Sequence, residues 1–304
     1  MNRLAMQLCG VDFKNPVIAA SGTYGFGREY NEFYPISRLG GISCKGMTIR
    51  EKLGNPPPRI AETPDGMLNS VGLQNPGVEH FIEHDLPWLR QQDIVVIANI
   101  AGGTEEDYAA IAEKVNEADV DMVELNISCP NVKAGGAAFG TSPATAAQIT
   151  KIVKEKCPRK PLMVKLSPNV TNIAEIARAV EAAGADSVSL INTLLGMRID
   201  IRTRRPILRN NKGGLSGPAV FPVAVRMVNE VYQAVKIPVV GLGGIATWQD
   251  AIEMVLAGAS AIQVGTAMFA DPYAPLHIIE GMDEYLEENG IDRIADLVGG
   301  VTLW

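Results

Sequence analysis

Short apolar runs recur along the whole chain and alternate with more polar stretches. Most of these runs are almost continuously apolar rather than alternating, and they are rich in Val and Ile. Continuous apolar runs of this length are typical of strands that are buried on both faces of a parallel sheet. Eight strands are therefore predicted, at residues 16–22, 40–48, 93–102, 121–130, 161–168, 186–193, 237–244 and 260–268.

Several of the intervening stretches carry apolar residues at helical spacing. Helices are predicted at residues 104–118, 141–156, 172–183, 221–235 and 247–257. A repeated strand–helix unit is the signature of a (β/α)8 barrel, which we favour over an open doubly wound sheet because no linker or composition change divides the chain. We expect a single TIM-barrel domain over residues 1–304, with a short hairpin or strand before residue 16 that closes the bottom of the barrel.

Three connections are much longer than the others, and each of them follows a strand. They span residues 54–77, 131–143 and 194–217, after the second, fourth and sixth predicted strands. Connections that follow strands lie at the C-terminal face of a barrel, where barrel enzymes place their active sites. Loops this long in a compact domain usually serve as lids or binding loops. We therefore expect the functional site at this face.

Composition and charge exclude several classes of protein. Hydrophobic residues make up 47% of the 304 residues, which is enough for a core, and the net charge of −7 gives no general attraction to nucleic acid or to an anionic membrane. No run approaches the roughly 20 apolar residues of a membrane span, and charged residues interrupt the start of the chain too early for a secretory signal. The four cysteines lack the spacing of zinc or iron–sulfur ligands. We expect a cytoplasmic protein that holds no metal.

Polar residues occur near the C-terminal ends of seven of the eight predicted strands. Asparagine offers a donor and an acceptor without charge, which suits the edge of a flavin or a pyrimidine. Their clustering at one end predicts a ligand site rather than isolated strand-end hydrogen bonds. The residues are Ser21, Lys45, Asn99, Asn126, Ser128, Cys129, Lys165, Asn192, Thr193 and Thr266.

Two lysines, Lys45 and Lys165, lie within apolar strands, and no acidic residue stands beside either of them in the sequence. Burial of an ammonium group without a partner is costly. We expect a bound anion or electron-rich ligand to compensate them. The alternative is a salt bridge across the barrel to Glu124, which lies on the same side of its strand as Asn126.

Glycine motifs end the seventh and eighth predicted strands, at residues 239–245 (VVGLGGI) and 264–268 (VGTAM). Barrel proteins commonly bind phosphate at these two strand ends through backbone N–H groups. Gly243 and Gly244 would let the backbone approach the phosphate, and Gly265 and Thr266 would offer an N–H and a hydroxyl group. A phosphorylated cofactor is therefore predicted. FMN fits best, because it combines one phosphate with one polar ring system.

Cys129 is the candidate for chemistry, since it stands just past the fourth strand in the segment NISCPN. An unperturbed thiol titrates near pH ~8.5, so in a water-poor site beside a lysine it could act as a general base. The alternative role is that of a small buried hydrophobic residue. We adopt that interpretation for the other three cysteines, Cys9, Cys44 and Cys157.

Longer motifs resemble those of one enzyme family, in the same order along nearly the whole chain. They are SCKGMT, LNSVGLQNPG, NISCPNVKAGGAAFG, VKLSPNV, SLINT, GGLSGPA, PVVGLGGI and QVGTAMF. On these motifs the chain resembles class 1 dihydroorotate dehydrogenase, specifically the FMN-containing catalytic subunit of the class 1B form. The resemblance implies oxidation of (S)-dihydroorotate to orotate in de novo pyrimidine biosynthesis.

The resemblance also implies roles for individual residues. Cys129 would remove a proton from C5 of dihydroorotate while hydride leaves C6 for N5 of FMN. Substrate contacts are implied for Lys45, Asn69, Ser70, Val71, Gly72, Leu73, Asn126, Asn192 and Thr193. FMN contacts are implied for Ser21, Lys45, Gly46, Asn99, Asn126, Lys165, Ile191, Gly217, Gly243, Gly244, Gly265 and Thr266.

In class 1B enzymes, electrons pass to NAD+ through a second subunit that carries FAD and a [2Fe-2S] cluster. This chain has neither the cysteines for such a cluster nor a GxGxxG motif after a strand. The resemblance therefore implies a heterotetramer of two catalytic and two electron-transfer subunits. One alternative is a class 1A homodimer that uses fumarate as oxidant, although the segment VKAGGAAFG favours class 1B. Another alternative is a non-catalytic flavin-binding barrel.

Overall fold

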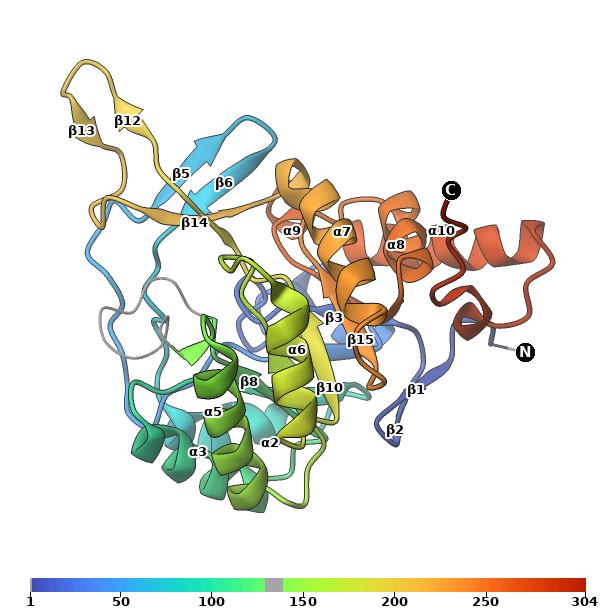
Figure 1. Ribbon diagram of the computed structural model, residues 1–304, viewed down its shortest axis with the longest axis horizontal. Coiled ribbons are helices and arrows are strands. Elements are labelled where there is room, and N and C mark those ends of the chain that lie inside the picture. The colour runs from blue at the N-terminus through green and yellow to red at the C-terminus, as the bar shows by residue number, and fades with distance from the viewer. Residues whose placement is uncertain (1, 129–138) are drawn as a thin grey trace.

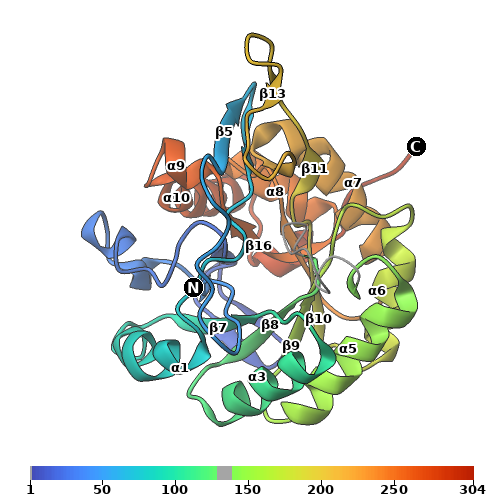
Figure 2. The same ribbon diagram turned by 90° about the vertical axis from the view of Figure 1, so that its left-hand side faces the viewer.

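The computed structural model describes residues 2–128 and 139–304. Eight strands form a closed barrel, and helices surround it (Figures 1 and 2). The strands are β3 (Val17–Ala19), β4 (Gly41–Ser43), β7 (Val95–Ile100), β8 (Met122–Asn126), β9 (Leu162–Lys165), β10 (Ser187–Leu190), β15 (Val239–Leu242) and β16 (Ala259–Val264). Neighbours follow one another in chain order, every pair is parallel, and β16 closes the ring on β3. The predicted (β/α)8 TIM barrel is confirmed, with all eight predicted strands.

The five predicted helices are also confirmed, with ends within a few residues of the expected ones. Two of them begin at threonine caps: the Thr104 hydroxyl accepts a hydrogen bond from the backbone N–H of Asp107, and Thr247 forms a reciprocal capping box with Asp250. The helices are α3 (Glu105–Glu117), α5 (Pro143–Lys156), α6 (Ile173–Ala182), α7 (Phe221–Tyr232) and α8 (Trp248–Leu256).

Further helical segments complete the outer layer. Those that cover the barrel or its rim are α1 (Val78–His80), the π-helical turn η3 (Phe81–Asp85), α2 (Leu86–Leu89), α9 (Ala267–Ala270) and α10 (Ala274–Glu288). Short 3-10 turns are η1 (Tyr30–Glu32), η2 (Ile36–Arg38), η4 (Pro218–Val220) and η5 (Ile294–Leu297). Across the described ranges, no helix has both the length and the apolar character that crossing a membrane requires.

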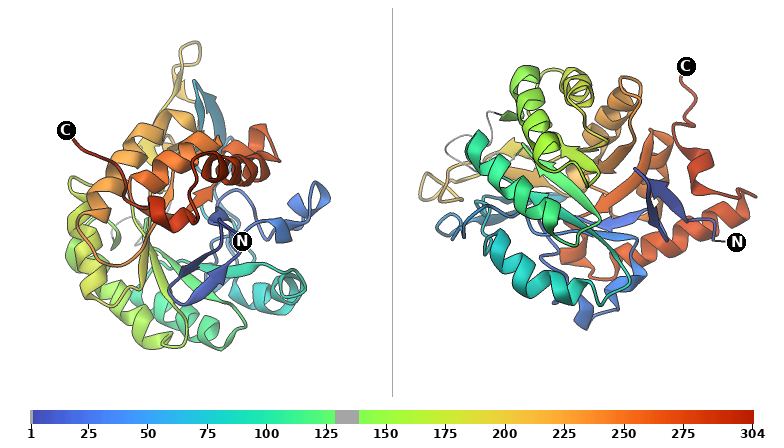
Figure 3. Two further views of the ribbon diagram at one scale, coloured as in Figure 1. Left: turned by 90° about the vertical axis from the view of Figure 1, so that its right-hand side faces the viewer. Right: turned by 90° about the horizontal axis from the view of Figure 1, so that it is seen from below.

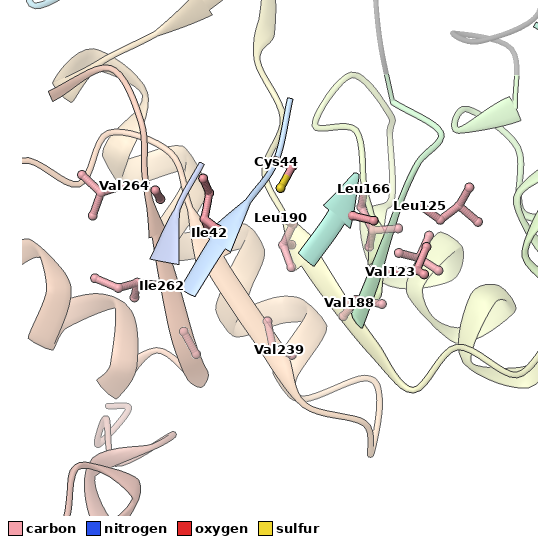
Figure 4. Close-up of a cluster of buried hydrophobic side chains, with 14 of the residues drawn as sticks. Ile42, Cys44, Val123, Leu125, Leu166, Val188, Leu190, Val239, Ile262 and Val264 are labelled. Atoms are coloured by element: carbon pink, nitrogen blue, oxygen red, sulfur yellow. The ribbon is translucent and has the colours of Figure 1, made fainter. Parts of the chain in front are cut away.

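Outward-facing strand residues form the main hydrophobic core together with the helices. Figure 4 shows part of this cluster, including Ile42, Val123, Val188 and Val264. Cys44 belongs to the same cluster and is fully buried, and burial raises the pKa of its thiol. The prediction that Cys44 is a small buried hydrophobic residue is therefore confirmed.

The bottom of the barrel is closed by an N-terminal hairpin, as the sequence predicts. Strands β1 (Met6–Leu8) and β2 (Val11–Phe13) pair in antiparallel fashion and lie across the N-terminal end of the barrel (Figure 3). Leu8 and Phe13 are buried in a second cluster, where they meet the lowest inward-facing residues of six strands. Those residues are Ile18, Ile97, Met122, Met163, Val240 and Ala261. The lower half of the barrel is therefore filled mainly by apolar side chains.

The long connections build a small sheet at the opposite, C-terminal face, beside the barrel opening (Figures 1 and 2). Its strands are antiparallel in the order β11 (Leu194–Gly196), β14 (Gly213–Ser216), β6 (Gly66–Asn69) and β5 (Ile60–Thr63). A hairpin of β12 (Ile199–Asp200) and β13 (Arg205–Pro206) projects beyond it. The sequence predicts loops here but not their pairing, because strands of two to four residues show no readable periodicity.

We predict that truncation of the hairpin plug destabilises the barrel from below. Leu8→Ala or Phe13→Ala would leave a cavity in an apolar core and cost about 3 kcal/mol. The midpoint of thermal unfolding should then fall by several degrees. The matched control is Gln7→Ala on the exposed side of the same strand, which should change stability by less than ~0.5 kcal/mol. Equal effects of the inward and outward substitutions would show that the hairpin does not act as a plug.

Candidate active site

A fully buried carboxylate, Glu124 of β8, lies inside the barrel directly above the apolar bottom. Inward-facing positions alternate along a strand, so the residue two places after Met122 belongs to the next interior layer. Four side chains from four other strands donate hydrogen bonds to its two oxygens. The donors are Ser43 Oγ (2.6 Å) and Asn99 Nδ2 (2.6 Å) on Oε2, and Ser189 Oγ (2.8 Å) and Gln263 Nε2 (2.7 Å) on Oε1.

Lys165 of β9 supplies the opposite charge. Its Nζ lies 3.9 Å from Glu124 Oε2 and 3.4 Å from Gln263 Oε1, and the residue is only 4% exposed. Burial alone would raise the pKa of Glu124, but the charge of Lys165 and the hydrogen bonds together hold that pKa below its ordinary value. The carboxyl group is therefore ionised.

Part of the charge compensation of Lys165 comes from the barrel itself. A salt bridge to Glu124, the alternative to compensation by a ligand, is present, but it joins the adjacent strands β8 and β9 rather than crossing the barrel. Both contacts of Lys165 are long for an ammonium group, which has three hydrogen bonds to donate. Lys165 also lines the pocket described next, so it keeps the capacity to bind a ligand there.

A pocket opens above this polar layer, at the C-terminal face of the barrel. It lies between the strand ends and the small sheet that the long connections form. Most of the predicted site residues are among those that line it. They are Ser21, Lys45, Gly46, Asn69, Val71, Gly72, Leu73, Asn126, Lys165, Ile191, Asn192, Thr193, Gly217, Gly243, Gly244, Gly265 and Thr266.

Two predicted residues, Ser70 and Asn99, are fully buried behind the pocket lining. The side-chain oxygen Asn99 Oδ1 has no hydrogen-bond partner among the described residues, although Nδ2 of the same amide is bound to Glu124. A Cβ atom at Gly46, which lines the pocket, would lie 2.8 Å from Asn99 Oδ1. The absence of a side chain at Gly46 therefore leaves a buried acceptor next to the pocket.

Cys129 lies outside the described residues.

The ends of β8 and β10 carry a connected set of amides and hydroxyls. Asn126 Oδ1 accepts hydrogen bonds from the backbone N–H and the hydroxyl of Ser128, both at 3.2 Å. Asn192 Nδ2 donates to Ser128 Oγ at 2.7 Å, and Asn192 Oδ1 accepts from the backbone N–H of Thr193 at 2.8 Å. These bonds fix the orientation of two amides on one wall of the pocket, which suits a planar ligand with its own donors and acceptors.

The two glycine motifs meet as expected, because β15 and β16 are neighbours in the barrel. Gly243 and Gly244 have φ values of 121° and 83°, which side-chain-bearing residues rarely adopt. A Cβ at Gly244 would lie 2.8 Å from the Phe221 nitrogen and 2.9 Å from the Gly217 carbonyl oxygen. Glycine is thus required at this corner of the pocket.

The sequence predictions did not include several lining residues. Gln263 could have been found, since it lies in β16 two positions before Gly265 and therefore points to the same side of the chain. Ser216 accepts a hydrogen bond from the Thr266 hydroxyl at 2.8 Å, but it reaches the pocket only through the unpredicted sheet. The remaining additions are Ala20, Gly22, Thr23, Ile60, Met67, Leu215, Pro218, Val220, Leu242, Ile245, Ala267 and Phe269.

Comparison with known proteins identifies the family of the chain. Residues 3–286 match the family described as dihydroorotate dehydrogenase. A relative from Geobacillus sp. (strain WCH70) is 56% identical over 300 residues, which cover 98% of this chain and 96% of the relative. Relatives from Bacillus cereus (strain AH187) and Bacillus anthracis (strain A0248) are each 57% identical over 300 residues, covering 98% of this chain and 97% of theirs. All three are named dihydroorotate dehydrogenase B (NAD(+)), catalytic subunit. The chain therefore belongs to the dihydroorotate dehydrogenase family.

Proposed function

We propose that this chain oxidises (S)-dihydroorotate to orotate in de novo pyrimidine biosynthesis, with FMN as its cofactor. The observation that carries the proposal is a barrel-mouth pocket that combines two lysines, a set of oriented amides and a glycine corner. Lysine attracts an anionic substrate, and amides match the donors and acceptors of a pyrimidine ring. Membership of the family and the names of the relatives support the same reaction.

The residues at the pocket fit FMN. Asn99 Oδ1 is a buried acceptor without a described partner, and a planar ring that carries an N–H group could satisfy it. Glycine at 243, 244 and 265 leaves room for backbone contact with a phosphate. Bound FMN would supply the electron acceptor, taking hydride from C6 of the substrate at its N5. We propose that it is held by Ser21, Lys45, Gly46, Asn99, Asn126, Lys165, Ile191, Gly217, Gly243, Gly244, Gly265 and Thr266.

The substrate is proposed to lie against the lysine and amide wall of the pocket. The Lys45 ammonium would face the negative charge of dihydroorotate, and Asn126 and Asn192 would orient the ring. The loop from Asn69 to Leu73 would cover it, since four of its five residues line the pocket. The proposed contacts are Lys45, Asn69, Ser70, Val71, Gly72, Leu73, Asn126, Asn192 and Thr193.

We further propose that Cys129 is the general base that removes the proton from C5. Support for its location comes from Ser128, the residue before it, which is hydrogen-bonded to Asn126 and Asn192 at the pocket wall. In contrast, the three described cysteines lie elsewhere: Cys44 and Cys157 are in the outer core, and Cys9 lies in the turn of the bottom hairpin. A thiol beside a pocket lined by two lysines would be drawn toward the thiolate form, which is the basic one.

A partner subunit is proposed to relay the electrons to NAD+. The relatives' names specify both NAD(+) and a catalytic subunit. Among the described residues, no group of three or more His, Cys, Asp or Glu side chains is placed to hold a metal ion. We propose that FAD and a [2Fe-2S] cluster reside on the partner, in a heterotetramer of two catalytic and two electron-transfer subunits.

We predict that Cys129→Ala slows reduction of bound FMN by dihydroorotate at least about a hundredfold, because the reaction loses its general base. The rate is measured anaerobically by stopped-flow absorbance. The matched control is Cys9→Ala, at the opposite end of the barrel, which should react at the wild-type rate. An alanine variant at position 129 that reduces FMN at the wild-type rate would remove Cys129 from the mechanism.

We predict that Gly244→Ala raises the dissociation constant of FMN about tenfold or more, because the new Cβ would push apart two segments of the pocket. The control is Gly10→Ala. Gly10 has the same φ of 83°, but a Cβ there would meet nothing within 4 Å. Binding to the apoprotein is measured by quenching of flavin fluorescence. An equal loss of affinity in both variants would assign the effect to backbone strain alone.

The proposed acceptor can be tested with the purified, FMN-loaded chain. On its own it should oxidise dihydroorotate once per flavin but sustain turnover with neither NAD+ nor fumarate. Addition of the electron-transfer partner should start NADH formation. Rapid fumarate reduction by the chain alone would instead identify a class 1A-type homodimer.

A further inference from the structure

The polar layer around Glu124 contains more buried polarity than barrel stability requires. A buried ion pair contributes little stability compared with apolar packing of the same volume. Here five side chains from five other strands converge on one carboxylate. Three of the five, Asn99, Lys165 and Gln263, lie at or directly behind the pocket lining. This distribution points to a role in the site above.

We propose that Glu124 is a positioning residue for the flavin site, whose carboxylate orients the amides of Asn99 and Gln263 and supplies the counter-charge of Lys165. The inference rests on the proposed function, because it takes FMN as the ligand of the pocket. Glu124 does not itself line the pocket. It acts only through Asn99, Gln263 and Lys165.

The carboxylate determines which end of each amide faces the pocket. An ionised carboxylate accepts hydrogen bonds and donates none. Asn99 must therefore direct Nδ2 toward Glu124, which leaves Oδ1 as the free acceptor next to Gly46. Gln263 must likewise direct Nε2 toward Glu124, which leaves Oε1 for the Lys165 ammonium at 3.4 Å. As a result, one acceptor (Asn99 Oδ1) and one cation (the Lys165 ammonium) are held in fixed positions facing the ligand.

Charge is the second part of the role. With Glu124 ionised, the buried pair of Glu124 and Lys165 is neutral as a unit. Without the carboxylate, an unbalanced cation would lie at the pocket wall, in surroundings of low dielectric constant where its field is strong. A cation beside a flavin stabilises the reduced flavin, because the reduced form is richer in electrons. Glu124 is therefore expected to lower the reduction potential of the cofactor.

Glu124→Gln tests both parts while it keeps the side-chain volume. The new NH2 group must face either Ser43 and Asn99 or Ser189 and Gln263. A serine hydroxyl can rotate to accept a hydrogen bond from this NH2 group. Asn99 or Gln263, in contrast, must turn its amide around, which exchanges the donor and acceptor that the amide presents toward the pocket. We expect the FMN dissociation constant to rise about tenfold or more, the effect of one lost charge-assisted hydrogen bond. The flavin potential should shift to more positive values.

Two controls separate positioning from a structural role. Ser43→Ala removes one hydrogen bond from the same carboxylate without a change of charge and without touching the pocket lining, so the thermal midpoint should fall while the flavin potential stays unchanged. Glu288→Gln, on an exposed residue at the end of α10, should change neither quantity. A positive potential shift with Ser43→Ala equal to that with Glu124→Gln would overturn the proposal.

A charge cycle tests the pair from the lysine side, and its first variant, Lys165→Met, does not depend on the folding of Glu124→Gln. Lys165→Met leaves the carboxylate uncompensated, so the potential should move to more negative values. In the double variant Glu124→Gln, Lys165→Met the two shifts should largely cancel. Lys165→Met with an unchanged potential would overturn the proposal.

These readouts need no dihydroorotate, so they separate this inference from the proposed reaction. A holoenzyme with the expected potential shifts that fails to oxidise dihydroorotate would refute the proposed function and leave the role of Glu124 standing. A wild-type chain that binds no FMN would refute both.

Discussion

The interior of this barrel is organised around one buried negative charge. A carboxylate without solvent is tolerated only when hydrogen bonds and an opposite charge surround it. Glu124 receives both from five other strands, so their side chains must meet at one height inside the barrel. The interior thereby separates into an apolar floor, a polar layer and an open pocket.

This layering explains why the chemistry lies at one end. Below Glu124, the hairpin residues Leu8 and Phe13 pack between the strands in an apolar cluster. Above it, the strand ends present lysine, amide and hydroxyl groups whose orientations are fixed by bonds to one another. The small sheet from the long connections forms the remaining wall. The pocket is thus lined partly by barrel strand ends and partly by the long connections.

Much of this arrangement could be predicted from the sequence. Buried parallel strands appear in a sequence as apolar runs. These runs predict the eight strands, and they place Lys45, Asn126 and Lys165 near the C-terminal ends of their strands. The glycine corner followed from counting strands, because the seventh and eighth are neighbours in any closed eight-stranded barrel.

The remainder depends on contacts between distant segments. The sequence indicates Glu124 only as a partner of Lys165, because a single sequence does not show that Ser43, Ser189 and Gln263 reach the same oxygens. The pairing of β6 with β14 joins segments about 145 residues apart through strands of four residues each. Neither segment has a period that would reveal the other. The interior alternation in Met122, Glu124 and Asn126 was the one readable sign of the polar layer.

We propose that this polar barrel mouth is a flavin site at which dihydroorotate is oxidised. The most direct measurement is an anaerobic titration of the FMN-loaded chain with dihydroorotate, followed by visible absorbance and by detection of orotate. We expect the flavin absorbance to bleach with one equivalent of substrate per FMN and an equal amount of orotate to appear. A yellow protein whose spectrum does not change as dihydroorotate is added would contradict this proposal.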